Sequence, residues 1–330
     1  MTSSVTLAFL GDLMLGRGVN RMLRRKTPEW FWGDTLPILH GTAGAFANLE
    51  CPLTATQIQW RRSWKYFHFR ADPEAVEILR CANVRFVCLA NNHILDFETA
   101  GLLDTRRTLD AAGIGHAGAG RDVTEAATPV QIDLAGLKVG VIAATDNMRA
   151  FRAGTHEPGT HLIEISATSP ALGPIREAAA ALRRDGAGLI VLSIHWGPNM
   201  RHRPNERFRD FARAAIDAGI DVLHGHSAHV FQGVERRGRG LILYDTGNFL
   251  DDYWKFPFRH DNWSFVFLLD LEDGRMTRLR LVPVLLHPWP VSRAKGDTFR
   301  AINARMTELC AAYDTPVVGT AEGLAIPLAP

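Results

Sequence analysis

Five short polar clusters in this 330-residue chain carry side chains that can bind a metal ion, and each follows an apolar run. They are Gly11-Asp12, Asn48-Leu49-Glu50, Asn91-Asn92-His93, His195-Trp196-Gly197 and His224-Gly225-His226-Ser227-Ala228-His229. The apolar runs are typical of buried strands, and ligands in open α/β folds gather where strands end. Carboxylate, amide oxygen and imidazole donors together suit Mn, Fe or Zn better than Ca. The sequence therefore predicts loops that converge on a divalent metal site, as in a metal-dependent hydrolase.

The cluster from His224 to His229 is the most specific of these signals. Three histidines at spacings of two and three residues, directly after a strand, are hard to explain by packing. At least two of them should therefore face a common centre. In the cluster Asn91-Asn92-His93, an amide oxygen can bind a metal while the adjacent imidazole protonates a leaving group.

The remaining clusters also have simpler interpretations. Asp12 alone could be a turn or helix-capping residue, and Glu50 alone could be an acid on a surface loop. His195 could be a buried core residue, although Trp196 and Gly197 after it favour an exposed turn. As a pair, Asp12 and Glu50 could bridge two cations.

The elements that must position these residues follow from apolar runs and helical periodicity. Strands are expected at Val5–Leu10, Gly44–Leu49, Arg85–Ala90, Lys138–Ala144, Leu189–His195, Ile220–His224, Leu241–Asp245, Ser264–Leu271 and Thr277–Val284. Helices are expected after Pro73, at Thr99–Ala112 and Pro174–Arg184, after an Asn205 cap, and at Asp297–Tyr313. Strands and helices alternate up to Ala228, which favours an α/β core. The later strands predict a second, more antiparallel sheet, and the tail Thr315–Pro330 predicts a loosely packed extension.

Composition narrows the class of protein. The formal net charge of +2 gives no reason to expect a nucleic-acid or membrane-surface partner. The four cysteines form no CxxC pair, which favours buried free thiols in a reducing compartment. The first apolar run is too short for a transmembrane helix and does not resemble a signal peptide, so we expect no membrane anchor and a cytoplasmic location.

The motifs resemble those of the CapA family, which is named for capsule and poly-γ-glutamate biosynthesis and is similar to calcineurin-like metallophosphoesterases. The resemblance rests on Gly11–Arg17, Asn48–Thr54, Ala90–Asp96, His195–Gly197, Gly225–His229 and Tyr244–Phe249. It implies a four-layer α/β/β/α sandwich over residues 1–290, with a C-terminal helix and tail at 291–330 packing on it. It also implies a two-metal site in the loops at one edge.

Carried over by position, the resemblance assigns a role to each residue of the clusters. Asp12 would bind one metal, Asn92 the other, and Glu50 would bridge both, while His93 would be the catalytic imidazole. The remaining ligands would be His195, His226 and His229.

Two departures from the wider superfamily leave one ion or two as alternatives. Met14 stands where an imidazole ligand is usual, and a thioether is a poor ligand for such cations. The usual Gly-His-x-His is stretched by one residue at Gly225–His229. His224 and His68 are the candidate replacements.

The leading functional hypothesis is hydrolysis by a metal-bound hydroxide, with His93 as the proton donor. Arg17 could grip phosphate or carboxylate of an anionic small-molecule or polymer substrate. The bond could be a phosphoester or a γ-glutamyl amide. The alternative is a non-catalytic accessory protein in polymer synthesis or export. The basic and aromatic segment Trp60–Arg70 could hold an anionic substrate or be a solvated strand face.

Overall fold

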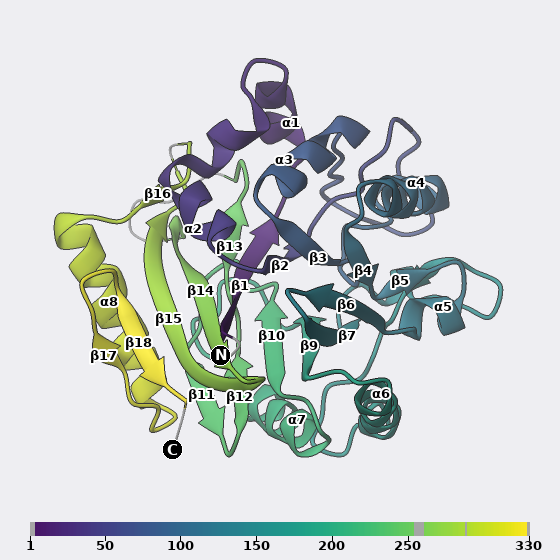
Figure 1. The fold of residues 1–330 in the computed structure, drawn as a ribbon. Coiled ribbons are helices and arrows are strands. Elements are labelled where there is room, and N and C mark those ends of the chain that lie inside the picture. The colour runs from purple at the N-terminus through teal and green to yellow at the C-terminus, as the bar shows by residue number, and fades with distance from the viewer. Residues whose placement is uncertain (1–3, 254–260, 288, 329–330) are drawn as a thin grey trace.

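Two β-sheets pack face to face, and helices cover the outer face of each (Figure 1). The computed structural model describes residues 4–253, 261–287 and 289–328. The arrangement is the four-layer α/β/β/α sandwich predicted from the sequence, and that prediction is confirmed.

The first sheet is mixed, with its parallel strands at one side and its antiparallel strands at the other. Its strand order is β17 (Val318–Gly319), β18 (Leu324–Pro327), β15 (Arg275–Leu285), β14 (Trp263–Glu272), β1 (Ser4–Leu13), β2 (Gly44–Leu49), β3 (Val84–Cys88) and β4 (Gly115–Ala117). Two short strands join it, β13 (Asn248–Leu250) beside β1 and β16 (Ser292–Arg293) beside β15. Strands β1 to β4 are parallel to one another, so their carboxyl ends share one edge.

The second sheet is mostly parallel. Its order is β11 (Val234–Arg237), β12 (Gly240–Leu243), β10 (Val222–His226), β9 (Leu189–His195), β7 (Leu137–Thr145) and β6 (Val130–Leu134). Strands β12, β10, β9 and β7 are parallel, and the edge strands β11 and β6 are antiparallel to their neighbours. A separate strand pair joins β5 (Ala119–Gly120) to β8 (Gly159–Thr160).

Both faces of the central strands are buried, which explains their nearly continuous apolar runs. In β1, Ala8 and Leu10 face the outer helices, whereas Leu7 and Phe9 enter the layer between the sheets. Helices α1 (Arg17–Leu23), α2 (Leu36–His40), α3 (Val76–Cys81) and α4 (Glu98–Ala111) cover the first sheet. Helices α6 (Leu172–Arg184) and α7 (Glu206–Asp217) cover the second, and α5 (Val123–Ala127) lies beside β5. The predicted Asn205 cap is present, since its side chain accepts a hydrogen bond from the Phe208 N–H.

Two sequence predictions for the C-terminal third are wrong. The strands after Ala228 form no sheet of their own: β11 and β12 extend the second sheet, and β13 to β18 extend the first. The tail is not loosely packed either, because β18 pairs with β15 and buries Leu324 and Ile326 between the sheets. Helix α8 (Gly296–Ala311) contributes Ile302 and Met306 to the same layer.

Two further expectations concern cysteines and membranes. All four cysteines are free, and Cys51, Cys88 and Cys310 are buried, as predicted. Within the described part of the chain, no helix has the length and apolar character that crossing a bilayer requires.

Candidate metal centre

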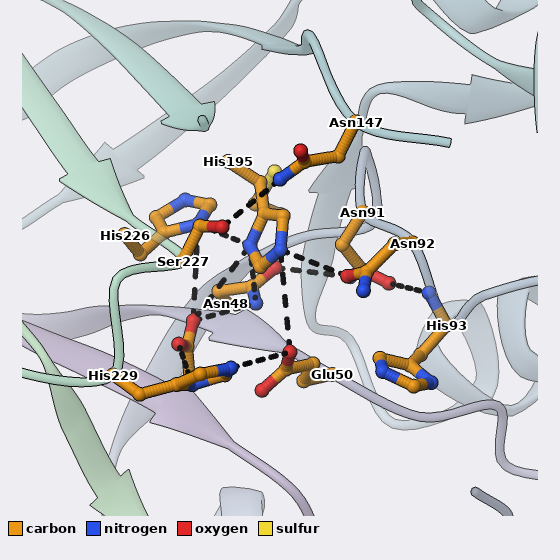
Figure 2. Close-up of polar contacts among 12 residues, drawn as sticks. Asn48, Glu50, Asn91, Asn92, His93, Asn147, His195, His226, Ser227 and His229 are labelled. Atoms are coloured by element: carbon orange, nitrogen blue, oxygen red, sulfur yellow. Dashed lines mark hydrogen bonds and ion pairs between the residues drawn. The ribbon is translucent and has the colours of Figure 1, made fainter. Parts of the chain in front are cut away.

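The carboxyl ends of four parallel strands, β1 and β2 of one sheet and β9 and β10 of the other, bring the polar clusters together. Asp12 lies beside Asn48 in the first sheet, and His195 lies beside His226 in the second. Figure 2 shows the carboxylate of Glu50 between the rings of His195, from β9, and His229, from the loop after β10. The convergence predicted from the sequence therefore results from two parallel sheet edges that meet at one end of the sandwich.

Two groups of donor atoms could each hold a metal ion, and Asp12 belongs to both. One group is Asp12, His195 and His226, and the other is Asp12, Glu50 and His229; in each, the donor atoms lie within 4.8 Å of one another. Asp12 Oδ1 is 3.8 Å from His195 Nδ1 and 3.9 Å from His226 Nδ1. Its Oδ2 is 3.2 Å from His229 Nδ1. Asp12 is therefore the residue that the two groups share, while Glu50 Oε1 lies 4.0 Å from His195 Nε2 and 3.8 Å from His229 Nε2.

The carboxylates of this centre fit a cation because their charge is buried without enough hydrogen-bond donors. Asp12 and Glu50 are fully buried, and Asp12 Oδ2 and Glu50 Oε1 accept no hydrogen bond. The nearby His229 Nδ1 bonds to Asn248 Oδ1 at 2.9 Å instead. A buried carboxylate without a partner is costly, and a coordinated cation removes that cost. The donor set could therefore hold a divalent metal ion.

The electrostatics of the imidazoles agree with this assignment. Burial lowers the pKa of His195 to about 3 and that of His226 well below its usual range, so both rings are neutral donors. Burial also acts to lower the pKa of His229, but the Glu50 and Asp12 carboxylates outweigh it and raise that pKa to about 10. Burial and the Asp12 charge raise the pKa of Glu50 well above its usual range. The two carboxylates thus favour positive charge next to them, which a metal ion would supply.

Besides Asn248, three more asparagines lie around the donor groups. Asn92 Oδ1, the amide oxygen that the sequence predicted as a ligand, lies 2.9 Å from His195 Nε2. Asn48 donates to Asp12 Oδ1 at 2.8 Å, and Asn91 donates to Asn48 Oδ1 at 3.0 Å. Asn48 and Asn91 therefore orient the ligands, a role that sequence reasoning missed because it depends on contacts between different strands.

His93 lies beside the centre and forms a pair with Asp96. Its Nδ1 is 2.6 Å from Asp96 Oδ2, and the ring of Phe69 stacks on it with centroids 4.2 Å apart. Asp96 Oδ1 is 3.2 Å from the ammonium of Lys65, whose side chain is only 8% exposed. Burial lowers the pKa of His93, and the Asp96 carboxylate opposes this shift. Sequence reasoning missed this pair, although the spacing of three residues between His93 and Asp96 could have indicated it.

Three predicted residues stand apart from the donor groups. His224 is buried with its Nε2 2.9 Å from the carbonyl of Leu10, so it ties the two sheets together and belongs to neither group. His68 Nε2 lies 3.2 Å from the Trp60 carbonyl, also outside both groups. Arg17 pairs with Asp252 through Nη2 at 2.8 Å.

Segments of backbone approach each other closely at the two glycines that precede Asp12 and His226. A Cβ on Gly11 would lie 1.9 Å from the Gly247 carbonyl oxygen, and one on Gly225 would lie 2.1 Å from that of Tyr244. Larger residues cannot stand there, so Gly11 and Gly225 let neighbouring segments pack against Asp12 and His226.

A cavity of about 560 Å³ opens beside the donor groups. It is lined by Arg17, Lys65, Tyr66, Phe67, Phe69, Asn92, His93, Asn199, Met200, His229, Asn248, Tyr253 and Asp261. This size suits a small-molecule ligand or one or two units of a polymer. Both predicted catalytic residues, His93 and Arg17, therefore face the same space as the predicted ligands His229 and Asn92.

Comparison with known proteins shows the family to which the chain belongs. The profile of the family described as bacterial capsule synthesis protein PGA_cap matches residues 6–253, which include every donor residue of the centre. The chain belongs to this family. The CapA-family resemblance and the metallophosphoesterase-like fold are thereby confirmed.

Relatives cover most of the chain. The capsule biosynthesis protein CapA of Bacillus anthracis is 29% identical over 306 residues, 90% of this chain and 72% of that protein. A probable polyglutamine synthesis accessory protein of Mycobacterium tuberculosis is 30% identical over 333 residues, 88% of this chain and 87% of that protein. A crystal structure of a hypothetical protein from Thermus thermophilus has a TM-score of 0.49 at 15% identity, covering 88% of this chain and 100% of that one.

Proposed function

We propose that this capsule-synthesis family member is a metal-dependent hydrolase acting on a phosphoester or related bond, including a γ-glutamyl amide, of an anionic substrate. The observation that carries the proposal is Asp12, shared by two buried donor groups beside a cavity that His93 lines. One or two Mn, Fe or Zn ions held by these groups would lower the pKa of a water molecule and polarise the scissile bond.

The chain's own residues would bind the ions and move the proton. Asp12, His195 and His226 would hold one ion, and Asp12, Glu50 and His229 the other, with Asn92 adding an amide oxygen. Because Asp96 engages Nδ1 of His93, Nε2 is the nitrogen left to donate a proton to the leaving oxygen or nitrogen. The Asp96 carboxylate would stabilise the protonated ring until that transfer.

Arg17 would bind the negative charge of the substrate. Its Nε and Nη2 groups bond to Asp252, which fixes the guanidinium at the cavity while Nη1 remains for a substrate oxygen. A planar guanidinium held in this way suits phosphate or carboxylate.

The test measures metal per chain and turnover in the same preparation. The protein is loaded with Mn, Fe(II) or Zn and assayed on bis-p-nitrophenyl phosphate and on poly-γ-glutamate. We expect His93→Ala to lower turnover by about 100-fold or more while its metal content stays at the wild-type level. His40→Ala, a change of an exposed histidine on α2, is the control and should behave as wild type. Absence of turnover on both substrates with every metal would contradict the hydrolase.

The second candidate is an accessory role in polymer synthesis without catalysis. The name of the Mycobacterium tuberculosis relative favours it, because that protein is described as an accessory protein. Binding of poly-γ-glutamate without turnover, across all three metals, would support this role over the hydrolase.

A further inference from the structure

Exposed apolar side chains gather in one short segment of the chain. Among the residues that the structure describes, six large hydrophobic side chains are exposed, and four of them lie between residues 58 and 67. These four are Ile58, Trp64 at 83%, Tyr66 at 74% and Phe67 at 53% exposure. Scattered exposed apolar residues need no explanation, but a contiguous group marks a binding surface. We call Trp64, Tyr66 and Phe67 the aromatic rim.

The aromatic rim continues into the cavity beside the metal centre. Trp64 and Tyr66 have ring centroids 6.1 Å apart, and those of Tyr66 and Phe67 are 4.6 Å apart. Phe67 then stacks on Phe69 at 6.1 Å, and Phe69 stacks on His93. Tyr66 and Phe67 also line the cavity itself. A ligand that packs on the aromatic rim can therefore extend into the cavity as far as His93.

Contacts with the buried Asp96 anchor the segment that carries the aromatic rim. Lys65 points inward to Asp96, between the outward Trp64 and Tyr66. The N–H of Phe69 donates to Asp96 Oδ2 at 2.7 Å, and the N–H of Trp60 donates to the Asp96 carbonyl at 2.9 Å. The rings are thus held outward by buried contacts of their own segment.

Charge around the aromatic rim is largely neutralised. Three of the four lysine and arginine side chains in residues 60–70 pair with carboxylates. The pairs are Arg62–Glu98, Lys65–Asp96 and Arg70–Asp72. A polyanion such as a nucleic acid or polyglutamate would instead need rows of uncompensated cations. The rim favours a neutral unit with flat apolar faces, next to the charged group bound at the metal centre.

We propose that the aromatic rim is a subsite for the pyranose rings of a glycan that carries a phosphoester, with that phosphoester at the metal centre. A pyranose presents a C–H face that packs on an aromatic ring, and its hydroxyl edge stays in water at an exposed site. The two steeply inclined ring contacts, 60° for Trp64–Tyr66 and 73° for Tyr66–Phe67, turn the ring faces in different directions. That arrangement suits sugars along a twisting glycan better than parallel stacked bases. This inference rests on the proposed function, because it names the substrate class of the same site.

The experiment is calorimetric titration of the metal-loaded full chain. The probes are cellohexaose and chitohexaose as neutral glycans, with poly-γ-glutamate and the oligonucleotide (dT)12 as polyanions. We expect at least one hexasaccharide to bind, and Trp64→Ala and Tyr66→Ala each to weaken its Kd by about tenfold. Trp64→Phe keeps an aromatic ring, so it should raise Kd by less than Trp64→Ala does. Val318→Ala removes exposed apolar surface from β17 and should leave Kd unchanged.

Three results would overturn the glycan subsite. They are no hexasaccharide binding, binding that ignores removal of the rings, and tighter binding of either polyanion that depends on Trp64. Metal content and aryl phosphodiester turnover of the wild-type protein separate this failure from that of the hydrolase. If both persist while the glycans do not bind, only the subsite is wrong; if both are absent, the hydrolase is wrong whatever the rim binds.

Discussion

Asp12 is the side chain that the two donor groups share. It is fully buried, its Oδ1 faces His195 and His226, and its Oδ2 lies beside His229. Asn48 supplies one hydrogen bond, which is not enough to compensate a buried negative charge. The sequence could mark Asp12 as a candidate ligand because a carboxylate follows an apolar run. It could not predict that both donor groups share Asp12, since that depends on how the second sheet faces the first.

Asp12→Asn keeps the size of the side chain and removes its charge, so we expect it to weaken metal binding in both donor groups. The affinity should fall by about 100-fold or more, because a ligand contributes at least as much as the groups that orient it. Glu50→Gln should affect one group alone and leave about half of the wild-type metal if two ions bind. Metal per chain after dialysis, measured by inductively coupled plasma mass spectrometry, checks both. Asp297→Asn, at a side chain 94% exposed, is the control; a fully loaded Asp12→Asn protein would contradict the bridging role.

At the scale of elements, the polar residues at and after the ends of strands have two different roles. Strand β9 brings its last residue, His195, to the donor groups, whereas residues 60–70 send Lys65 inward and three rings outward. Apolar runs predicted β2 and β9 to the residue, because a continuous run ends sharply at a polar cluster in each. Segment 60–70 could not be predicted in this way. Its alternation of basic and aromatic residues fits a strand, but it forms none, and its shape depends on the buried contacts with Asp96.

Lys65→Met tests whether this segment positions His93. Removing the ammonium leaves the buried Asp96 carboxylate with less compensating charge. Breaking a buried ion pair in this way lowers the free energy of unfolding by about 3–5 kcal/mol. We expect kcat to fall by about tenfold or more with KM little changed, because the His93–Asp96 pair loses its fixed geometry while the rest of the cavity remains. Lys65→Arg should recover part of kcat. Arg62→Met, at a side chain 57% exposed and paired with Glu98, is the control within the same segment. Equal loss in both variants would assign Lys65 a general structural role instead.

At the scale of the whole molecule, the metal centre depends on strands far from it in sequence. The family match ends at residue 253, yet β14 pairs with β1 along most of its length, and β15 and β18 continue the sheet. Their apolar residues fill the layer between the sheets, together with Ile302 and Met306 of α8. Hydrophobic pattern predicted that β14 and β15 exist but not which sheet they join, because pairing partners leave no mark on a single strand's alternation.

The C-terminal strand β18 should accordingly be part of the stability of the whole domain. Ile326 is fully buried between the sheets, and its strand pairs with β15 from Arg278 to Leu281. Ile326→Ala should lower the free energy of unfolding by about 2–5 kcal/mol, since it leaves a cavity in a packed core. Val318→Ala, at a side chain 53% exposed on the neighbouring β17, should change it by less than about 0.5 kcal/mol. Urea unfolding followed by circular dichroism measures both. If the two variants unfold at the same urea concentration, the tail is the loose extension that its composition suggested, and the first sheet ends at β15.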